Sequence, residues 1–74
     1  MRRLPPLTAL KAFEALGRLE NVKSAADELN VTPAAVTHQI RQLEEHLRVE
    51  LFTRSSKGMT LSKDGHAFFL VVTE

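Results

Sequence analysis

The stretch DELNVTPAAVTHQI, residues 27–40, ends one helical pattern and starts another within a few residues. Asn30 can adopt the left-handed backbone conformation that ends a helix. Thr32 can cap the next helix with its hydroxyl, and Pro33 suits the first helical position, where its missing N–H costs no hydrogen bond. Between them, we expect the apolar Val31 to be buried. The break therefore predicts two short helices held at an angle instead of one longer helix.

The segments on both sides of this break have the hydrophobic spacing of amphipathic helices. Upstream, a helix capped by Asn21 carries small and apolar residues on one face, at Val22, Ala25, Ala26 and Leu29. Downstream, a helix from Pro33 to about Leu47 has an apolar stripe at Val36, Ile40, Leu43 and Leu47. The N-terminal half of the opposite face is small, hydrogen-bonding and basic, with Ala34, His38 and Arg41 pointing away from the stripe and Thr37 on its flank.

A third amphipathic helix is predicted ahead of this pair, from Ala9 to about Leu19. Pro5-Pro6 prevents a helix at the start of the chain, so Thr8 is its expected N-cap. Gly17 weakens the helix near its end.

A hairpin and a last helix are predicted after Arg48. The pieces LFTR and MTLS are compatible with β-strands, and Gly58 in the connection SSKG suits a positive φ. Ser62 can then cap a helix, KDGHAFFLVVTE, whose run FFLVV is apolar on all sides. Such a helix needs cover from a partner or from further sequence.

Length and composition restrict the possible functions. Seventy-four residues make at most one small domain, and the absence of cysteine excludes disulfides and thiolate metal sites. The three histidines lack the spacing of a helical zinc site, and no catalytic constellation is present, so we expect no enzyme activity, metal or cofactor. No window is long enough to span a bilayer, and the lack of disulfides fits a reducing cytosol, so we expect a cytoplasmic protein. The net charge of +1 does not by itself indicate a polyanionic partner.

Two short helices joined by a tight turn, the second with an exposed hydrogen-bonding front half, are typical of a helix-turn-helix. In that unit the second helix lies in the DNA major groove and its N-terminal side chains reach base edges. Thr37 can bond a base or a phosphate, while His38 and Arg41 can donate to phosphates or to guanine acceptors. The hairpin would form a wing whose Arg54 and Lys57 are placed to contact the neighbouring backbone.

The residues Asn21 to Ile40, together with QLEEHL, LFTR, SKGMTLS and Gly65, resemble the DNA-binding domain of LysR-type transcriptional regulators. The opening RLPPLTALKAFEAL and the run VTPAAVTHQI are especially similar to the subgroup of glycine-cleavage and β-lactamase regulators. The resemblance implies an all-α fold with a small β-hairpin: a winged helix-turn-helix with a three-helix core, followed by the start of a C-terminal linker helix. It places the domain at residues 5–62, the helix-turn-helix at 22–41, the wing at about 51–61 and a truncated linker helix at 63–74.

The resemblance also implies partners and site residues. The expected partners are double-stranded promoter DNA and a second copy of the chain, joined through the last helix, with no membrane. The expected location is therefore the cytoplasm, in association with the nucleoid. By position, the DNA-binding residues fall on Thr32, Pro33, Ala34, Thr37, His38, Arg41, Arg54 and Lys57. The expected dimerisation residues are Phe68, Phe69 and Val72.

Several positions depart from the family pattern. Pro33 stands where the family usually has a Gln able to read a base, and Val22 replaces a larger Phe. Arg48 replaces a usual Gly after the third helix, which strains a left-handed position. The family's large effector-binding domain is missing, so we expect no small-molecule effector site within this chain, which is either a fragment or a short protein that cannot sense a ligand.

Plainer interpretations remain open for several charged residues. Arg41 could pair with Glu45 one helical turn away, and such a pair contributes only a few tenths of a kcal/mol. His38 could be simply solvated, and Arg54 could anchor the wing to the core. The acidic residues that we expect to form a solvated face, or a surface seen by a polymerase or partner subunit, are Glu44, Glu45 and Glu50.

The alternative function is a protein-interaction module, in which the winged helix no longer binds DNA and the apolar last helix binds a protein partner. A module of that kind has no need for Thr37, His38 and Arg41 on the exposed face of the third helix.

Overall fold

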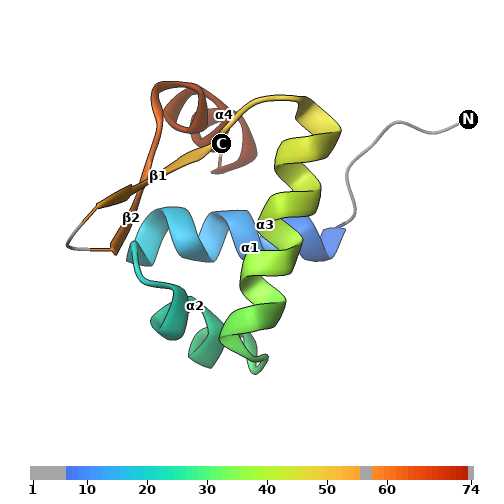
Figure 1. The fold of residues 1–74 in the computed structure, drawn as a ribbon, viewed down its shortest axis with the longest axis vertical. Helices are drawn as coiled ribbons and strands as arrows, with labels where there is room; N and C mark the ends of the chain where they lie inside the picture. Colours follow the sequence, from blue (N-terminus) through green and yellow to red (C-terminus); the bar gives the residue numbers. More distant parts are fainter. Residues whose placement is uncertain (1–6, 56–57, 74) are drawn as a thin grey trace, which may run out of the picture.

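The computed structural model describes residues 7–55 and 58–73, which form four helices and one two-stranded hairpin (Figure 1). In chain order these elements are α1 (Leu7–Leu19), α2 (Val22–Leu29), α3 (Pro33–Leu47), β1 (Phe52–Ser55), β2 (Gly58–Leu61) and α4 (Lys63–Thr73). The arrangement confirms the predicted winged helix-turn-helix with a three-helix core and a following helix. The exact extent of the domain, placed above at residues 5–62, stays a prediction.

Helix α1 is the centre of the fold. It contacts α2, α3, β2 and α4, and in Figure 1 α3 crosses it while the hairpin projects to one side. The largest fully buried side chains are Phe13, Leu16, Val36, Leu43 and Leu51. Because α1 contributes the first two of these and contacts both the helix-turn-helix and α4, it fixes where the helix-turn-helix lies relative to α4.

Three of the helices are followed by a non-glycine residue in the left-handed conformation. These residues are Glu20 after α1, Asn30 after α2 and Arg48 after α3, with φ of 58°, 59° and 61°. Only Asn30 belongs to a type that tolerates this conformation readily, and it was predicted to end α2. Arg48 does occupy the left-handed position at which strain was expected, and its amide donates to the Glu44 carbonyl (2.7 Å).

Replacing Arg48 with glycine should raise the free energy of unfolding by about 0.5–1 kcal/mol. The left-handed conformation destabilises a non-glycine residue by roughly 1–2 kcal/mol, and glycine removes this cost. Part of the gain is lost again, because glycine has more conformational entropy in the unfolded chain. Urea denaturation followed by far-UV circular dichroism measures the change. As a control, Gln42→Gly puts the same residue at an exposed interior position of α3 and should lower stability by about 1 kcal/mol. A loss of stability in the Arg48 variant would contradict the account of this cap.

Side-chain caps were predicted correctly at three helix starts. Asn21 Oδ1 accepts from Ser24 N (2.8 Å), Thr32 Oγ1 accepts from Ala35 N (3.1 Å), and Ser62 Oγ accepts from Gly65 N (2.9 Å). These caps set the first turns of α2, α3 and α4.

Two expectations about the helix ends were wrong. Thr8 does not cap α1, because the helix begins at Leu7 and Thr8 lies in its first turn; Pro5-Pro6 lies outside the described residues. Val31 is 45% exposed, not buried. Its amide serves the end of α2 by donating to the Ala26 carbonyl (3.0 Å), while its side chain lines a groove together with Leu29.

The hairpin is confirmed, with strands shifted by one residue from their predicted bounds. Its antiparallel register runs from Phe52↔Leu61 to Ser55↔Gly58. Gly58 has the predicted positive φ, +129°, and a Cβ there would lie 2.6 Å from the Glu20 carbonyl oxygen. The wing therefore rests against the connection between α1 and α2.

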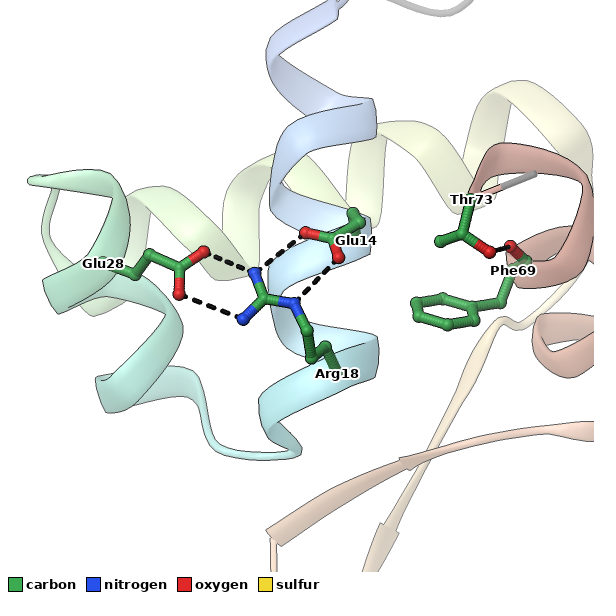
Figure 2. A network of polar contacts seen from close by, with 5 residues as sticks. All are labelled: Glu14, Arg18, Glu28, Phe69 and Thr73. Atoms are coloured by element: carbon green, nitrogen blue, oxygen red, sulfur yellow. Dashed lines mark hydrogen bonds and ion pairs between the residues drawn. The ribbon is translucent and has the colours of Figure 1, made fainter.

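One guanidinium group joins α1 to α2 (Figure 2). Arg18 Nε and Nη2 donate to both carboxylate oxygens of Glu14 (2.8 and 3.0 Å), and Nη1 and Nη2 donate to those of Glu28. Hydrogen bonds from Arg18 hold the pKa of both carboxyls below the ordinary value of 4.5. The network is exposed, so it orients α2 on α1 more than it stabilises the domain.

Candidate nucleic-acid interface

The outward face of α3 has the residues that the sequence predicted. Ala34, His38 and Arg41 are exposed and Thr37 is half-buried, whereas the stripe that faces α1 and α2 is buried at Val36, Ile40 and Leu43. The 3.6-residue period of the helix produces this division, because positions three or four apart share a face. The exposed side chains are therefore available to a partner outside the chain.

The N-terminal end of α3 is exposed to solvent and carries small side chains. Thr32 and Pro33 are exposed, and the next two residues are alanines, so the backbone lies near the surface. The Thr32 hydroxyl holds only one of the first-turn amides, and the positive end of the helix dipole is at this end. Such a terminus favours an anionic partner.

A cleft separates α3 from the wing. Its volume is about 200 Å³, and its wall includes Thr37 and Arg41 from α3 and Arg54 and Met59 from the wing. A shallower hollow of about 390 Å³ shares Thr37, Arg54 and Met59 with it. Three residues predicted separately as candidate contacts thus line one cleft. Met59 lines it too, although nothing in the sequence singled it out.

The two arginines of this cleft are free of partners among the described residues. Arg41 makes no ion pair with Glu45, and the exposed side chain of Arg54 makes no hydrogen bond or ion pair with any described residue that would anchor the wing. The alternatives left open for both side chains are therefore not realised in residues 7–55 and 58–73. Lys57 lies outside the described residues.

The acidic residues at the cleft, whose wall also includes Glu44 and Glu50, are not one uniform solvated face. Glu45 and Glu50 are exposed as expected, but Glu44 is half-buried. Its Oε2 accepts from the backbone amide of Leu51 (2.8 Å) and, at 3.4 Å, from that of Phe52. The expectation that Glu44 is solvated was wrong because the chain turns back after α3 and brings these amides to its carboxylate.

Helix α4 has two different apolar faces. The Phe68 and Phe69 rings lie 5.1 and 5.9 Å from the Phe13 ring, and Val72 also packs against the core. Leu70 and Val71 are 71% and 69% exposed. The sequence could not separate the two faces, because every position from 68 to 72 is apolar and the periodic signal is lost.

The structure shows neither a metal cluster nor a membrane-spanning helix in its described parts. No three His, Asp or Glu side chains come together there in a way that could hold a metal ion. No helix in residues 7–55 or 58–73 combines the length and apolar character needed to cross a membrane.

Comparison with known proteins identifies the family. Residues 7–66 match the family described as bacterial regulatory helix-turn-helix protein, lysR family. The chain is 45% identical over 73 residues to the glycine cleavage system transcriptional activator of Escherichia coli K12, and 48% identical over 73 residues to the HTH-type transcriptional regulator BlaA of Proteus vulgaris. It covers 99% of its own length in both matches but only 24% and 25% of the two relatives. The crystal structure of a complex between the CbnR DNA-binding domain and DNA matches with a TM-score of 0.84 and 34% identity, over 99% of this chain and 79% of that one. The chain therefore belongs to the lysR family of bacterial regulatory helix-turn-helix proteins.

Proposed function

We propose that this chain is the sequence-specific DNA-binding part of a bacterial transcription regulator. Helix α3 enters the major groove, and the hairpin lies over the neighbouring sugar-phosphate backbone. The observation that carries the proposal is the cleft shared by Thr37, Arg41 and Arg54, whose two guanidinium groups have no partner among the described residues. The similarity to the CbnR domain in its DNA complex supports it.

The proposed contacts divide by chemistry. Thr32, Pro33 and Ala34 bring the front of α3 close to the groove floor and present its positive end to a phosphate. Thr37, His38 and Arg41 reach base edges or phosphates, since a guanidinium can donate to two guanine acceptors at once. Arg54 and Lys57 of the wing contact the backbone, which positions the domain without reading sequence.

We further propose that two copies of the chain pair through α4 on double-stranded promoter DNA. Leu70 and Val71 offer apolar area that the described residues leave exposed. Phe68, Phe69 and Val72, the residues expected for this role, lie behind that surface and hold α4 on the core. In this arrangement they support the contact from beneath while the two exposed residues provide its area.

The proposed function is tested by the salt dependence of DNA binding. Fluorescence anisotropy with a labelled pool of mixed-sequence duplexes should give a linear fall of log affinity with log salt, with about 0.9 in slope for each phosphate contact. A flat response would exclude DNA binding and leave the protein-interaction module, which would use the same exposed α4 face.

Arg41→Ala should weaken binding to a selected duplex by about 1–3 kcal/mol if the side chain reads a base, with relaxed preference at that position. The charge-matched control is Lys11→Ala, which removes an exposed cation of α1 that lies outside the cleft and should change affinity little. An unchanged sequence preference together with a smaller salt slope would limit Arg41 to a phosphate contact.

A further inference from the structure

Glu44 connects the end of α3 to the start of the wing through four backbone amides. Its main-chain carbonyl accepts from Arg48 N (2.7 Å) and Val49 N (3.2 Å), which closes the last turn of α3. Its side-chain Oε2 accepts from Leu51 N (2.8 Å) and more distantly from Phe52 N (3.4 Å), just where β1 begins. One residue of α3 therefore determines both how the helix ends and where the wing starts.

The amide that this carboxylate holds is poorly accessible to water. Leu51 is fully buried and Phe52 is 6% exposed. A carboxylate oxygen is a strong acceptor for a backbone N–H, and a buried amide that loses its partner is costly. Without the carboxylate, the segment around Leu51 must move to find another acceptor or water.

A movement at Leu51 would be passed to the wing. The Leu51 carbonyl accepts from Ser62 N (2.8 Å), and Ser62 Oγ donates to the Glu50 carbonyl (2.6 Å), so both strands leave from one hydrogen-bonded base. Arg54 follows three residues after Leu51 along β1 and lines the cleft opposite Thr37. The position of the Arg54 guanidinium relative to α3 thus depends on where Leu51 is held.

We propose that Glu44 is a positioning residue for DNA binding: its carboxylate oxygen holds the wing at the distance from α3 at which Arg54 meets the backbone. This inference rests on the proposed function, because it assigns how one of the proposed contacts is placed. Glu44 itself need not touch DNA, and its charge is unfavourable next to phosphates. Its carboxylate supplies a hydrogen-bond acceptor at the distance that the Leu51 amide requires.

Two conservative variants separate acceptor geometry from charge. Glu44→Gln keeps an oxygen at the same reach and removes the charge, whereas Glu44→Asp keeps the charge and shortens the reach by one methylene. Glu45→Gln is the matched control, because it removes the same charge from the adjacent, exposed position. The full chain is used throughout, with a labelled duplex that the unmodified protein selects from a random-sequence library, and circular dichroism verifies that each variant is folded.

The decisive readout is the effect of Arg54→Ala in each background. In the unmodified protein, and in the Glu44→Gln and Glu45→Gln variants, Arg54→Ala should lower the salt slope by about 0.9, the value of one phosphate contact. In the Glu44→Asp variant it should change slope and affinity hardly at all, since the wing is already displaced and the two changes are not additive. Faster hydrogen exchange of the Leu51 amide in Glu44→Asp, but not in Glu44→Gln, should accompany this.

Two results would overturn the inference while leaving DNA binding intact. One is an Arg54→Ala effect of the same size in the Glu44→Asp variant as in the unmodified protein. The other is loss of the Arg54 effect in Glu44→Gln but not in Glu44→Asp, which would assign the role to charge. A flat salt response of the unmodified protein would instead reject the proposed function itself, so the two failures are distinguishable.

Discussion

Gly65→Ala should lower the free energy of unfolding by about 3 kcal/mol or more, at or beyond the upper end of what overpacking costs. A Cβ at this buried position would lie 2.0 Å from the Leu51 carbonyl oxygen and 3.2 Å from Leu61 Cδ2. The first obstacle is backbone, which cannot rotate aside, and that same carbonyl accepts the hydrogen bond from Ser62 N. Either α4 or the base of the wing must shift, so urea denaturation should show a much lower midpoint.

Gly17→Ala is the matched control for this substitution. It too is a helical glycine with a close neighbour, since a Cβ would lie 2.7 Å from the Phe69 ring. That neighbour is a side chain which can swing, and alanine gains up to about 1 kcal/mol in helix propensity. We expect Gly17→Ala to cost clearly less than Gly65→Ala. Equal losses at the two sites would show that the rigidity of the Leu51 carbonyl does not determine the effect.

The sequence was most informative where structure depends on neighbouring residues. Asn30, Thr32 and Pro33 each act within one turn, through a left-handed backbone, a hydroxyl cap and a fixed φ, so the break between α2 and α3 was predicted nearly residue by residue. The buried stripe of α3 followed from its period alone. Gly58 was recognisable because a hairpin of this length needs a positive φ.

The sequence failed where a contact joins distant segments. The residues next to Glu44 in the sequence do not indicate that the Leu51 amide donates a hydrogen bond to its carboxylate. Likewise, the residues next to Gly65 do not indicate that a backbone carbonyl lies where a Cβ would be. Val31 was expected to be buried because it is apolar, but its amide is what the α2 cap uses, and its side chain lines a groove. Local patterns carry no information on such pairings, which depend on how α1 positions the other elements.

The candidate site shows the same division. The exposed positions of α3 were predicted from its period, and Arg54 was predicted from its place on the hairpin. That Arg54 shares a cleft with Thr37 and Arg41, and that Glu44 holds the base of the wing, could be seen only once the hairpin was placed beside α3.

Phe13→Ala should be the other severely destabilising change, with a loss of about 3–5 kcal/mol. Phe13 is fully buried, and its ring lies 5.6, 5.1 and 5.9 Å from those of Phe52, Phe68 and Phe69. It therefore joins α1 to both the wing and α4. A domain of this size has a total stability of about 4–11 kcal/mol, so the cavity would remove a large part of it.

The chain has no Trp or Tyr, so loss of the helical circular dichroism signal in urea is the suitable measurement. Leu70→Ala is the control, because a side chain that is 71% exposed should change monomer stability by no more than about 0.5 kcal/mol. Both variants are compared at concentrations where light scattering finds single chains, since pairing would add stability that depends on concentration. The contrast tests how α4 divides its apolar surface. If Leu70→Ala destabilised the single chain as much as Phe13→Ala, the outer face of α4 would belong to the core and could not be the surface proposed to meet a second copy.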